Sequence, residues 1–377
     1  MAIQLGVTFA GLRFENPFLL ASAPPTESDS NIMRAFDAGW GGVVTKTIGL
    51  HPVVNVVGPK TKFLRALADS PHLSMNKAGA GTALHSSWNW ELISNKTLDW
   101  WVPRLGRIKQ AHPTKMLVAS IMAGSGSDAE LRHWQTLARA CQDEGVDALE
   151  LNLSCPHMDR KDMGSNIGKD QELISVVAQV VKEVARVPVW AKLTPSTTDI
   201  VVEARGAFLG GADVVTSSNT FPSLPLIDPE TLEFEVNVDG LVSSGGLGGP
   251  AILPQSLAKM SQLTQAFPDK AFSGIGGIGE FAHALNYFLL GCGTVQVCTA
   301  AMLDHAVGPN VIAQLLTDMR ATMERHGWAT LEDFRGLRRQ AVVPHSQIRR
   351  PDAESYRGGY DLDESTSEPS PAAHVRG

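Results

Sequence analysis

The sequence of 377 residues is 43% hydrophobic and 19% charged, so the chain can bury a large apolar core. The formal net charge is −7 and no basic run is present, which argues against a nucleic-acid partner or an anionic membrane partner. None of the four cysteines belongs to a C-x-x-C pair, which is typical of a reducing cytosol and offers no ligand set for zinc or an iron–sulfur cluster.

The amino-terminal residues predict a cytoplasmic protein that begins with a β-hairpin. The first 20 residues lack the basic start and apolar block of a secretory signal. Residues 3–17 (IQLGVTFAGLRFENP) alternate between apolar and polar types, with a glycine turn near Gly11. We predict that this hairpin caps the bottom of the fold.

Eight short apolar runs follow, and amphipathic segments of helix length separate most of them. The predicted strands are residues 17–25, 41–49, 116–124, 148–156, 187–195, 212–220, 271–279 and 293–301. The predicted helices include residues 128–144, 170–185, 198–209, 252–266, 280–290 and 309–326. Eight β/α units with nearly continuous apolar strands predict an α/β fold, the closed parallel (β/α)8 barrel known as a TIM barrel.

Three segments need a separate interpretation. Residues 284–303 are the most membrane-like run, but Gly291 and Gly293 break it, so it predicts helix, turn and strand in a core. Residues 221–250 form a long excursion between the sixth strand and its helix, with a hairpin-like pattern inside. Residues past about 350 are polar, which predicts a disordered tail. We therefore expect a barrel over residues 1–330 and an extension over residues 331–377.

The carboxyl ends of the predicted strands are rich in polar residues and glycine. They carry Ser22, Lys46, Asn152, Ser154, Cys155, Lys192, Asn219, Thr220, Gly276, Gly277, Cys298 and Thr299. In a (β/α)8 barrel these ends meet on one rim, where active sites are built. A single polar strand end could simply face water, but the repetition favours a ligand site.

Two lysines lie inside apolar strands, Lys46 in VVTKTIG and Lys192 in WAKLTP. A buried ammonium group is unfavourable without an anionic partner. Two such groups at one rim indicate a bound group that is negative or becomes negative, and a flavin that gains charge on reduction fits. Salt bridges within the barrel are the alternative.

Glycine-rich stretches predict a phosphate site. Residues 274–279 (GIGGIG) match G-x-G-x-x-G, but the motif lies late in the chain and lacks the acidic residue that a dinucleotide site needs about 20 positions later. After the last barrel strands, backbone N–H groups beside a helix start can bind phosphate. The candidate residues are Gly248, Gly249, Gly276, Gly277, Cys298 and Thr299. The glycines could instead serve only tight turns.

Cys155 stands between Ser154 and Pro156 at a strand end, and the charged segment 156–170 after it is predicted to be a mobile lid. A thiol there could act as a general acid or base on carbon. Cys141 and Cys292 are instead expected to be small buried hydrophobes. No histidine spacing indicates a metal site.

Residues 86–97 (SSWNWELISNKT) are predicted to begin a helix, with Asn89 and Glu91 near its start. The pattern of these two residues is equally typical of helix capping and of a ligand site.

Several motifs in this order resemble those of the FMN-containing dihydropyrimidine dehydrogenases, within the class of dihydroorotate dehydrogenase-like barrels. They are LELNLSCPH, AKLTP, TDIV, GGAD, SNT, GIGGI and VQVCTAA, and the resemblance runs from about residue 3 to about residue 363. It implies reduction of uracil or thymine at the C5=C6 bond, or the reverse. It also implies that hydride passes between flavin N5 and C6 while Cys155 handles the proton at C5.

The resemblance also assigns binding residues. The implied pyrimidine ligands are Asn89, Glu91, Asn152, Asn219 and Thr220, and the implied flavin contacts are Ala21, Ser22, Lys46, Lys192, Gly246, Gly249, Gly277, Cys298 and Thr299. Amide side chains suit a pyrimidine edge, which alternates C=O and N–H. Glu91 would repel the carboxylate of orotate, so uracil or thymine is the preferred substrate.

The resemblance bears on electron transfer as well. Bacterial catalytic subunits of this family continue into a ferredoxin-like segment, whereas residues 360–377 contain no cysteine, so we expect no iron–sulfur cluster in this chain. FMN would exchange electrons with a soluble donor or acceptor, or with a separate protein. No NAD(P)H site is legible, and a homodimer or hetero-oligomer is expected.

Three alternatives stay open. One is a dihydroorotate dehydrogenase that uses a cysteine base. Another is an FMN-binding subunit that is active only with a partner protein. The last is a non-redox lyase that uses Lys192 as a Schiff-base amine.

Overall fold

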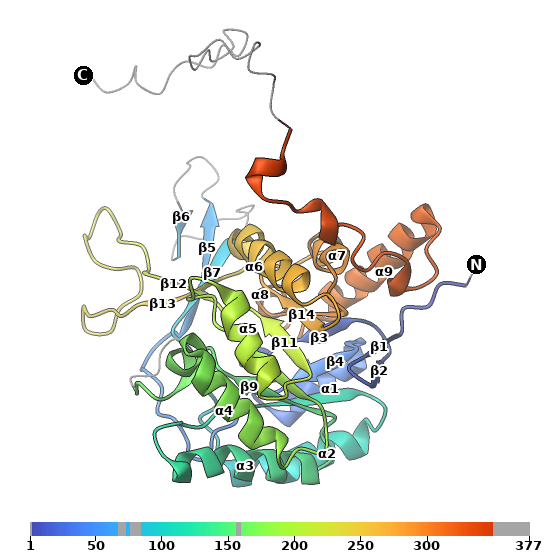
Figure 1. The fold of residues 1–377 in the computed structure, drawn as a ribbon. Helices are drawn as coiled ribbons and strands as arrows, with labels where there is room; N and C mark the ends of the chain where they lie inside the picture. The colour runs from blue at the N-terminus through green and yellow to red at the C-terminus, as the bar shows by residue number, and fades with distance from the viewer. Residues whose placement is uncertain (1, 67–72, 76–83, 156–159, 350–377) are drawn as a thin grey trace, which may run out of the picture. The chain divides into compact units, whose positions relative to one another are not determined.

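The computed structural model describes residues 2–66, 73–75, 84–155 and 160–349 (Figure 1). The chain divides into two compact units, Met1–Gln340 and Ala341–Gly377. In the second unit the described residues include a 3-10 turn over His345–Gln347. The tail predicted past residue 350 lies outside the described residues. The architecture below is that of the first unit.

A closed barrel of eight parallel strands forms the centre of this unit. In barrel order the strands are β3 (Phe18–Leu20), β4 (Gly42–Val44), β8 (Met116–Ile121), β9 (Ala148–Asn152), β10 (Val189–Lys192), β11 (Val214–Ser217), β14 (Ala271–Ile275) and β15 (Thr294–Val297), which pairs with β3. The eight predicted strands and the predicted TIM barrel are confirmed. Each strand is shorter than predicted, because the residues at its carboxyl end leave the sheet and enter the rim loops.

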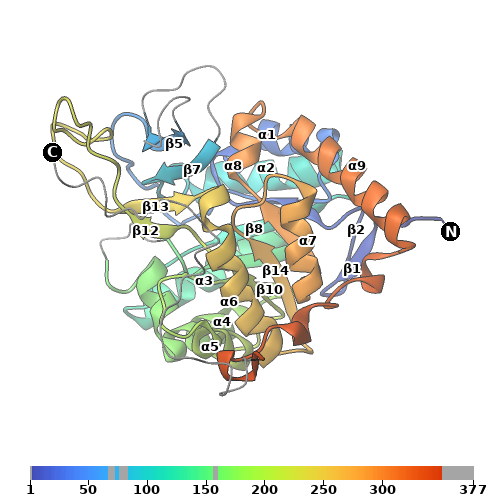
Figure 2. The same ribbon diagram turned by 90° about the horizontal axis from the view of Figure 1, so that it is seen from above.

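Helices surround the barrel, as Figure 2 shows from above. They are α1 (Asp29–Ala38), α2 (Leu98–Ala111), α3 (Asp128–Asp143), α4 (Gln171–Lys182), α5 (Ile200–Leu209), α6 (Leu253–Ala266), α7 (Phe281–Leu290), the short α8 (Thr299–Leu303) and α9 (Pro309–His326). Side chains of Ser28, Thr97, Ser127, Asp170 and Asp199 cap α1, α2, α3, α4 and α5 by accepting main-chain N–H groups. The six predicted helices are confirmed to within about two or three residues.

The amino-terminal hairpin is confirmed as strands β1 (Val7–Phe9) and β2 (Leu12–Phe14), joined through Ala10 and Gly11 at positive φ. The rings of Phe9 and Phe14 pack against Trp190 of β10, with the Phe9 and Trp190 centroids 5.6 Å apart. The hairpin therefore closes the end of the barrel at which the strands begin, as predicted.

The predicted helix start over residues 86–97 is wrong. Residues Leu84–Asn89 form strand β7, and α2 begins only at Leu98, behind its cap Thr97. Strand β7 pairs antiparallel with β5 (Thr61–Ala66) on one side and β13 (Gly245–Gly248) on the other. These tertiary pairings, with Trp88 fully buried, override the local helix pattern.

A second sheet of five strands thus lies apart from the barrel sheet, in the order β12 (Phe221–Ser223), β13, β7, β5 and β6 (Leu73–Ser74). It has its own core, made of Leu64, Met75, Trp88, Trp90 and Val236. Gly245 lies so close to Trp88 that a Cβ there would be 2.3 Å from the indole ring. The first glycines of the stretch 244–250 therefore serve a strand, and not only a turn before a helix.

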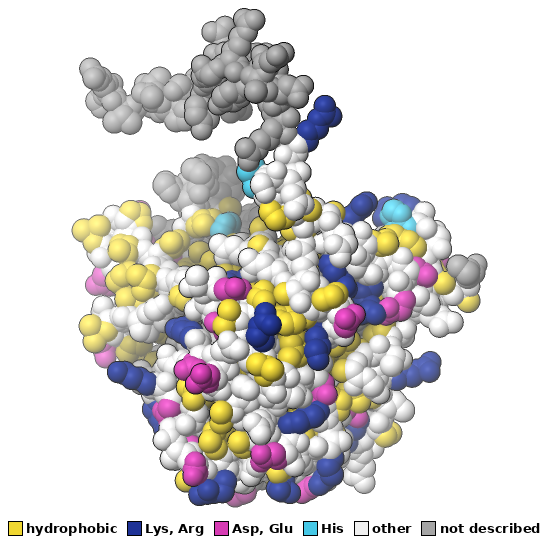
Figure 3. All heavy atoms as spheres, in the orientation of Figure 1, with side chains coloured by type: hydrophobic (Ala, Val, Ile, Leu, Met, Phe, Trp, Pro, Cys, Tyr) yellow, Lys and Arg dark blue, Asp and Glu magenta, His cyan; other side chains and the backbone are white. Residues whose placement is uncertain are grey.

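The remaining predictions about the excursion and the core agree with the structure. Within the excursion, bridges join Ile227 to Phe234 and Val238 to Leu241, so the hairpin-like pattern is confirmed as two tight reversals. The membrane-like run 284–303 is divided among α7, β15 and α8. In the described part of the chain, no helix is long and apolar enough to cross a membrane. Positively and negatively charged side chains are interspersed on the face that Figure 3 shows.

Candidate active site

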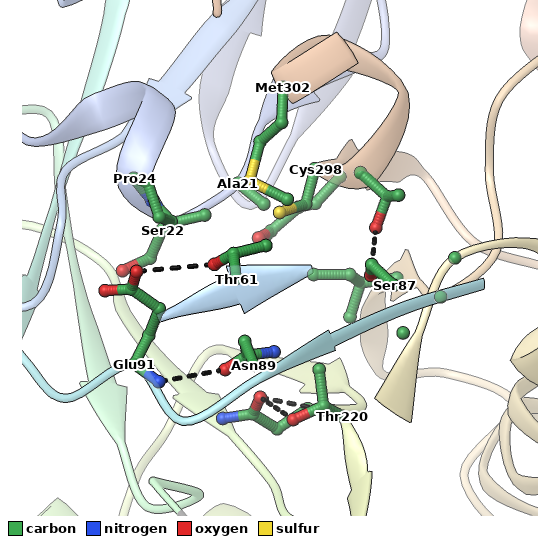
Figure 4. A pocket seen from close by; sticks show the side chains of 18 of the residues that line it. Ala21, Ser22, Pro24, Thr61, Ser87, Asn89, Glu91, Thr220, Cys298 and Met302 are labelled. Atoms are coloured by element: carbon green, nitrogen blue, oxygen red, sulfur yellow. Dashed lines mark hydrogen bonds between the residues drawn. The ribbon is translucent and has the colours of Figure 1, made fainter. Parts of the chain in front are cut away.

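A cavity opens at the carboxyl ends of the barrel strands, and the empty space in it and at its mouth amounts to about 1160 Å³. Its wall combines those strand ends with residues of the second sheet, among them Thr61 of β5 and Ser87 of β7 (Figure 4). The lining includes these predicted site residues: Ala21, Ser22, Lys46, Asn89, Glu91, Asn152, Cys155, Lys192, Asn219, Thr220, Gly249, Gly276, Gly277, Cys298 and Thr299. The rim predicted from polar strand ends is therefore one continuous site.

Of the residues predicted at the site, Ser154 and Gly246 do not line the cavity. Gly246 lies in β13. Its carbonyl accepts a hydrogen bond of 3.2 Å from Nδ2 of Asn89. A Cβ at this position would be 2.0 Å from Oγ1 of Thr220. Gly246 therefore supports two predicted ligand residues from behind, because β13 pairs directly with β7 at this point.

Lys46 and Glu91 form an ion pair at the edge of the cavity. Nζ of Lys46 lies 3.1 Å from Oε2 of Glu91, and the side chains are 5% and 17% exposed. Oγ1 of Thr61 donates to the other carboxylate oxygen at 3.3 Å (Figure 4). The internal salt bridge that stood as the alternative for the buried lysines is thus present for Lys46, and its partner is itself a predicted ligand residue.

Lys192 is different, although it is equally buried at 5% exposure. Its ammonium group makes no hydrogen bond or ion pair with any residue that the structure describes. Burial raises the pKa of the nearby Cys298 thiol to about 11, while Lys192 and Lys46 act in the opposite direction. Lys192 therefore leaves an unneutralised positive charge at the cavity wall, and this charge suits an electron-rich ligand.

The loop after β14 offers main-chain donors to the same cavity. Gly276 and Gly277 have φ values of +127° and +75°, which favour glycine. Side chains would also collide there, since added Cβ atoms would lie 2.3 Å from Ser256 Oγ and 2.6 Å from Leu253 Cβ. Among the described residues, nothing accepts a hydrogen bond from the N–H of Gly277. Such a loop can bind an anion through its amides.

Cys155 follows the end of β9 and is 4% exposed. Its carbonyl accepts a hydrogen bond of 2.9 Å from the N–H of Ser165. Residues 156–159 of the predicted lid lie outside the described residues. In the described part, Arg160 pairs with Glu130 and Asp162, and this pairing lowers the pKa of Asp162. Cys141 and Cys292 are fully buried away from the cavity, as predicted.

Several lining residues were missed in the sequence. Thr47 lies next to Lys46 and could have been found as one more polar strand end. Gln296 lies inside β15, where its Nε2 donates 2.8 Å to the fully buried carboxylate of Glu150. Ser87, which is 2.9 Å from Thr299, and Thr61 belong to the second sheet, and no local pattern indicates that this sheet reaches the rim.

Comparison with known proteins agrees with this geometry. Residues 4–323 match the family model described as dihydroorotate dehydrogenase. The chain belongs to the dihydroorotate dehydrogenase family. Family members are FMN-dependent oxidoreductases that act on CH–CH groups, so the predicted resemblance and the enzyme class are confirmed.

The most similar members of the family fall into two groups. The chain is 35% identical to the chloroplastic dihydropyrimidine dehydrogenase (NADP(+)) of Arabidopsis thaliana, over 92% of this chain and 79% of that one. It is 32% identical to the NAD-dependent dihydropyrimidine dehydrogenase subunit PreA of Escherichia coli, over 92% and 80%. It is 28% identical to the catalytic subunit of dihydroorotate dehydrogenase B (NAD(+)) of Thermoplasma acidophilum, over 89% and 98%.

The cavity fits the cofactor of the dihydroorotate dehydrogenase family. Lys192 supplies a positive charge that has no partner among the described residues, which suits the electron-rich side of an isoalloxazine ring. The amides of the loop at Gly276 and Gly277 suit the phosphate of FMN. These residues would hold the two ends of the cofactor.

We predict that replacing Lys192 with Met weakens FMN binding at least tenfold, or about 1.4 kcal/mol. The substitution keeps the apolar stem but removes the only positive charge at this point of the wall that has no anionic partner among the described residues. Titrating the apoprotein with FMN and following flavin fluorescence measures the change. Lys270→Met, at an exposed position, is the matched control and should bind FMN normally. Equal affinities for both variants would contradict the assignment.

Proposed function

We propose that this protein is an FMN-dependent oxidoreductase that interconverts a 5,6-dihydropyrimidine and the corresponding pyrimidine, uracil or thymine. The observation that carries the proposal is that Asn89, Glu91 and Cys155 line the same cavity. The names of the relatives from Arabidopsis thaliana and Escherichia coli support the same substrate class.

The amide of Asn89 is oriented to form hydrogen bonds with one edge of a pyrimidine ring. Its Oδ1 accepts a hydrogen bond from the N–H of Glu91 and its Nδ2 donates to the carbonyl of Gly246, each at 3.2 Å. A primary amide has two N–H donors and two acceptor lone pairs. Within the described residues, one donor and one acceptor of Asn89 are left, and they match a neighbouring C=O and N–H of a uracil ring.

Glu91 supports a neutral pyrimidine over orotate. Lys46 and Thr61 hold its two carboxylate oxygens, yet each oxygen keeps acceptor capacity for a ring N–H. A second carboxylate in the same poorly solvated cavity would be repelled. The charge of this side chain is therefore the proposed basis for the choice of substrate.

Cys155 is the proposed proton carrier. Bound FMN would supply the two-electron hydride chemistry. The thiol of Cys155 would give a proton to C5 of the pyrimidine during reduction and take it back during oxidation, as a general acid or base. Its burial supports this role, because a water-poor site protects carbon protonation from competing exchange.

The proposal also covers the electron-transfer partner and the cellular compartment of the protein. Two of the relatives are named as subunits, which supports electron exchange with a separate protein or a soluble donor. A second candidate is accordingly an FMN subunit that turns over only with its partner. A third is a dihydroorotate dehydrogenase, since the Thermoplasma acidophilum relative is matched over 98% of its length. None of the four cysteines forms a disulfide, which suits the proposed cytoplasmic location.

The substrate proposal is tested by reducing the flavin of the purified protein under anaerobic conditions and adding uracil, thymine or orotate separately. We expect uracil or thymine to restore the yellow absorbance of oxidised flavin. If orotate alone restored the absorbance, the protein would instead be a dihydroorotate dehydrogenase. A protein that turns over only after a cell extract is added would favour the subunit reading, and a purified protein without flavin would favour the lyase.

We predict that Glu91→Gln raises the KM for uracil about tenfold and reduces the discrimination against orotate. The change removes the charge that repels the orotate carboxylate while it keeps the size of the side chain. The measurement is the ratio of kcat/KM values for the two pyrimidines. Glu324→Gln, on the exposed face of α9, should leave the ratio unchanged. An unchanged ratio in Glu91→Gln would remove Glu91 from substrate choice.

We predict that Cys155→Ala and Cys155→Ser keep FMN but lose about 10²–10⁴-fold in turnover at pH 7, the range expected for a lost general acid. Steady-state turnover and the flavin spectrum are the two measurements. Cys141→Ala is the control, because Cys141 is a buried thiol of α3 whose pKa burial raises to about 12. Near-normal turnover of the Cys155 variants would exclude the thiol from the reaction.

A further inference from the structure

The buried hydroxyl of Thr47, the residue after Lys46, connects four parts of the rim. Thr47 is 3% exposed and lines the cavity. Its Oγ1 lies 2.8 Å from Ser120 Oγ and 3.2 Å from Ser22 Oγ. It also accepts a hydrogen bond of 2.8 Å from Nδ2 of Asn152. These three contacts join the ends of β3, β4, β8 and β9.

The three contacts use the hydroxyl group of Thr47 completely. A hydroxyl has one proton to donate and two lone pairs that accept. The amide N–H of Asn152 takes one lone pair, and Ser22 and Ser120 take the other lone pair and the proton. Thr47 therefore has no capacity left for a ligand and acts on the cavity only through its neighbours.

Main-chain groups decide which way the Asn152 amide points. Its Oδ1 accepts from the N–H of Ser154 at 3.2 Å and from the hydroxyl of Ser154 at 2.9 Å. A main-chain N–H can only donate, so the oxygen must face Ser154 and the nitrogen must face Thr47. Both lone pairs of the amide oxygen are then occupied. Within the described residues, one N–H of Asn152 is what remains for a ligand.

The side-chain amide of Asn219 makes even more hydrogen bonds within the protein. Nδ2 of Asn219 donates to the carbonyl of Ser154 at 3.1 Å and to its hydroxyl at 2.9 Å. Its Oδ1 accepts from the N–H and the hydroxyl of Thr220. A ligand can bond to Asn219 only by replacing one of these contacts. Asn152 and Asn89, unlike Asn219, thus already offer hydrogen-bonding groups to the cavity.

We propose that Thr47 is a positioning residue that anchors the amide nitrogen of Asn152, whose oxygen is already occupied by Ser154, so that the remaining N–H selects a ring carbonyl at this point. The N–H of Asn152 donates to that carbonyl, while Asn89 reads an adjacent C=O and N–H pair. The ligand class is therefore a cyclic imide or ureide with carbonyl groups on two sides. The identification of that ligand as uracil or thymine rests on the proposed function above.

A double-mutant cycle tests the role of Thr47. The variants are Thr47→Val, Asn152→Ala and the combination, with Thr47→Ser as the conservative variant that keeps the hydroxyl. The readouts are the Kd of uracil, from the change it causes in the flavin absorbance of the oxidised holoenzyme, and the separate values of KM and kcat. Flavin content shows that each variant is folded and loaded.

The expected result is a loss of about tenfold in uracil affinity for Thr47→Val, with KM affected more than kcat. In the Asn152→Ala background the same substitution should change affinity less than twofold, because its effect passes through the missing amide. Thr47→Ser should stay within about threefold of the natural protein. Thr136→Val, on the exposed face of α3, is the matched control and should bind uracil normally.

Three outcomes would overturn the inference. An equal loss in both backgrounds would mean that Thr47 acts independently of Asn152, and a Thr47→Ser variant as weak as Thr47→Val would mean that the hydroxyl is not the active group. Thr47→Ala replaces Thr47→Val in the cycle if the latter does not fold. Failure of the natural holoenzyme to bind any pyrimidine would reject the proposed function too, whereas binding with an uncoupled cycle rejects only the role of Thr47.

Discussion

The site depends on one constraint, the need of every polar group buried at the carboxyl rim of the barrel for a partner. The side chains there are buried, so an unpaired charge or amide is unfavourable. Lys46 satisfies the requirement with Glu91, and Thr47 satisfies it with two serines and Asn152. Lys192 and the amides after β14 do not satisfy it within the described residues. These unpaired groups indicate what the cavity binds, since a ligand must supply the negative charge and the hydrogen-bond acceptors that the described residues do not provide.

The second sheet turns an open barrel rim into a specific cavity. The barrel strands and the residues that follow them contribute Lys192 to the cofactor side, Asn152 to substrate binding and Cys155 to the proton transfer in our proposal. Asn89 is the last residue of β7, which pairs with β5 and β13, and both Asn89 and Glu91 line the cavity (Figure 4). Because these strands pair with each other and enclose their own apolar core, Asn89 stands at the end of a rigid strand and Glu91 follows it by two residues.

Predictions from sequence succeeded where the signal is local. Apolar runs of strand length, amphipathic runs of helix length and polar residues at strand ends report directly on neighbouring positions. The prediction for residues 86–97 failed because Ser86, Trp88 and their neighbours acquire a strand conformation only by pairing with two distant segments. The same reason explains why Thr61 and Ser87 were missed, and why the hydrogen bond between Asn89 and Gly246 was not foreseen.

From the sequence by itself followed the eight-fold β/α order, the rim on which the site is built, and the family that the comparisons confirm. Only the tertiary structure decided which polar groups satisfy one another and which are left for ligands. Lys46 meets Glu91 across 45 positions, Thr47 meets Asn152 across 105, and Asn89 meets Gly246 across 157. A residue type states what a side chain can donate or accept, but its remaining capacity is known only after folding has brought its distant partners to it.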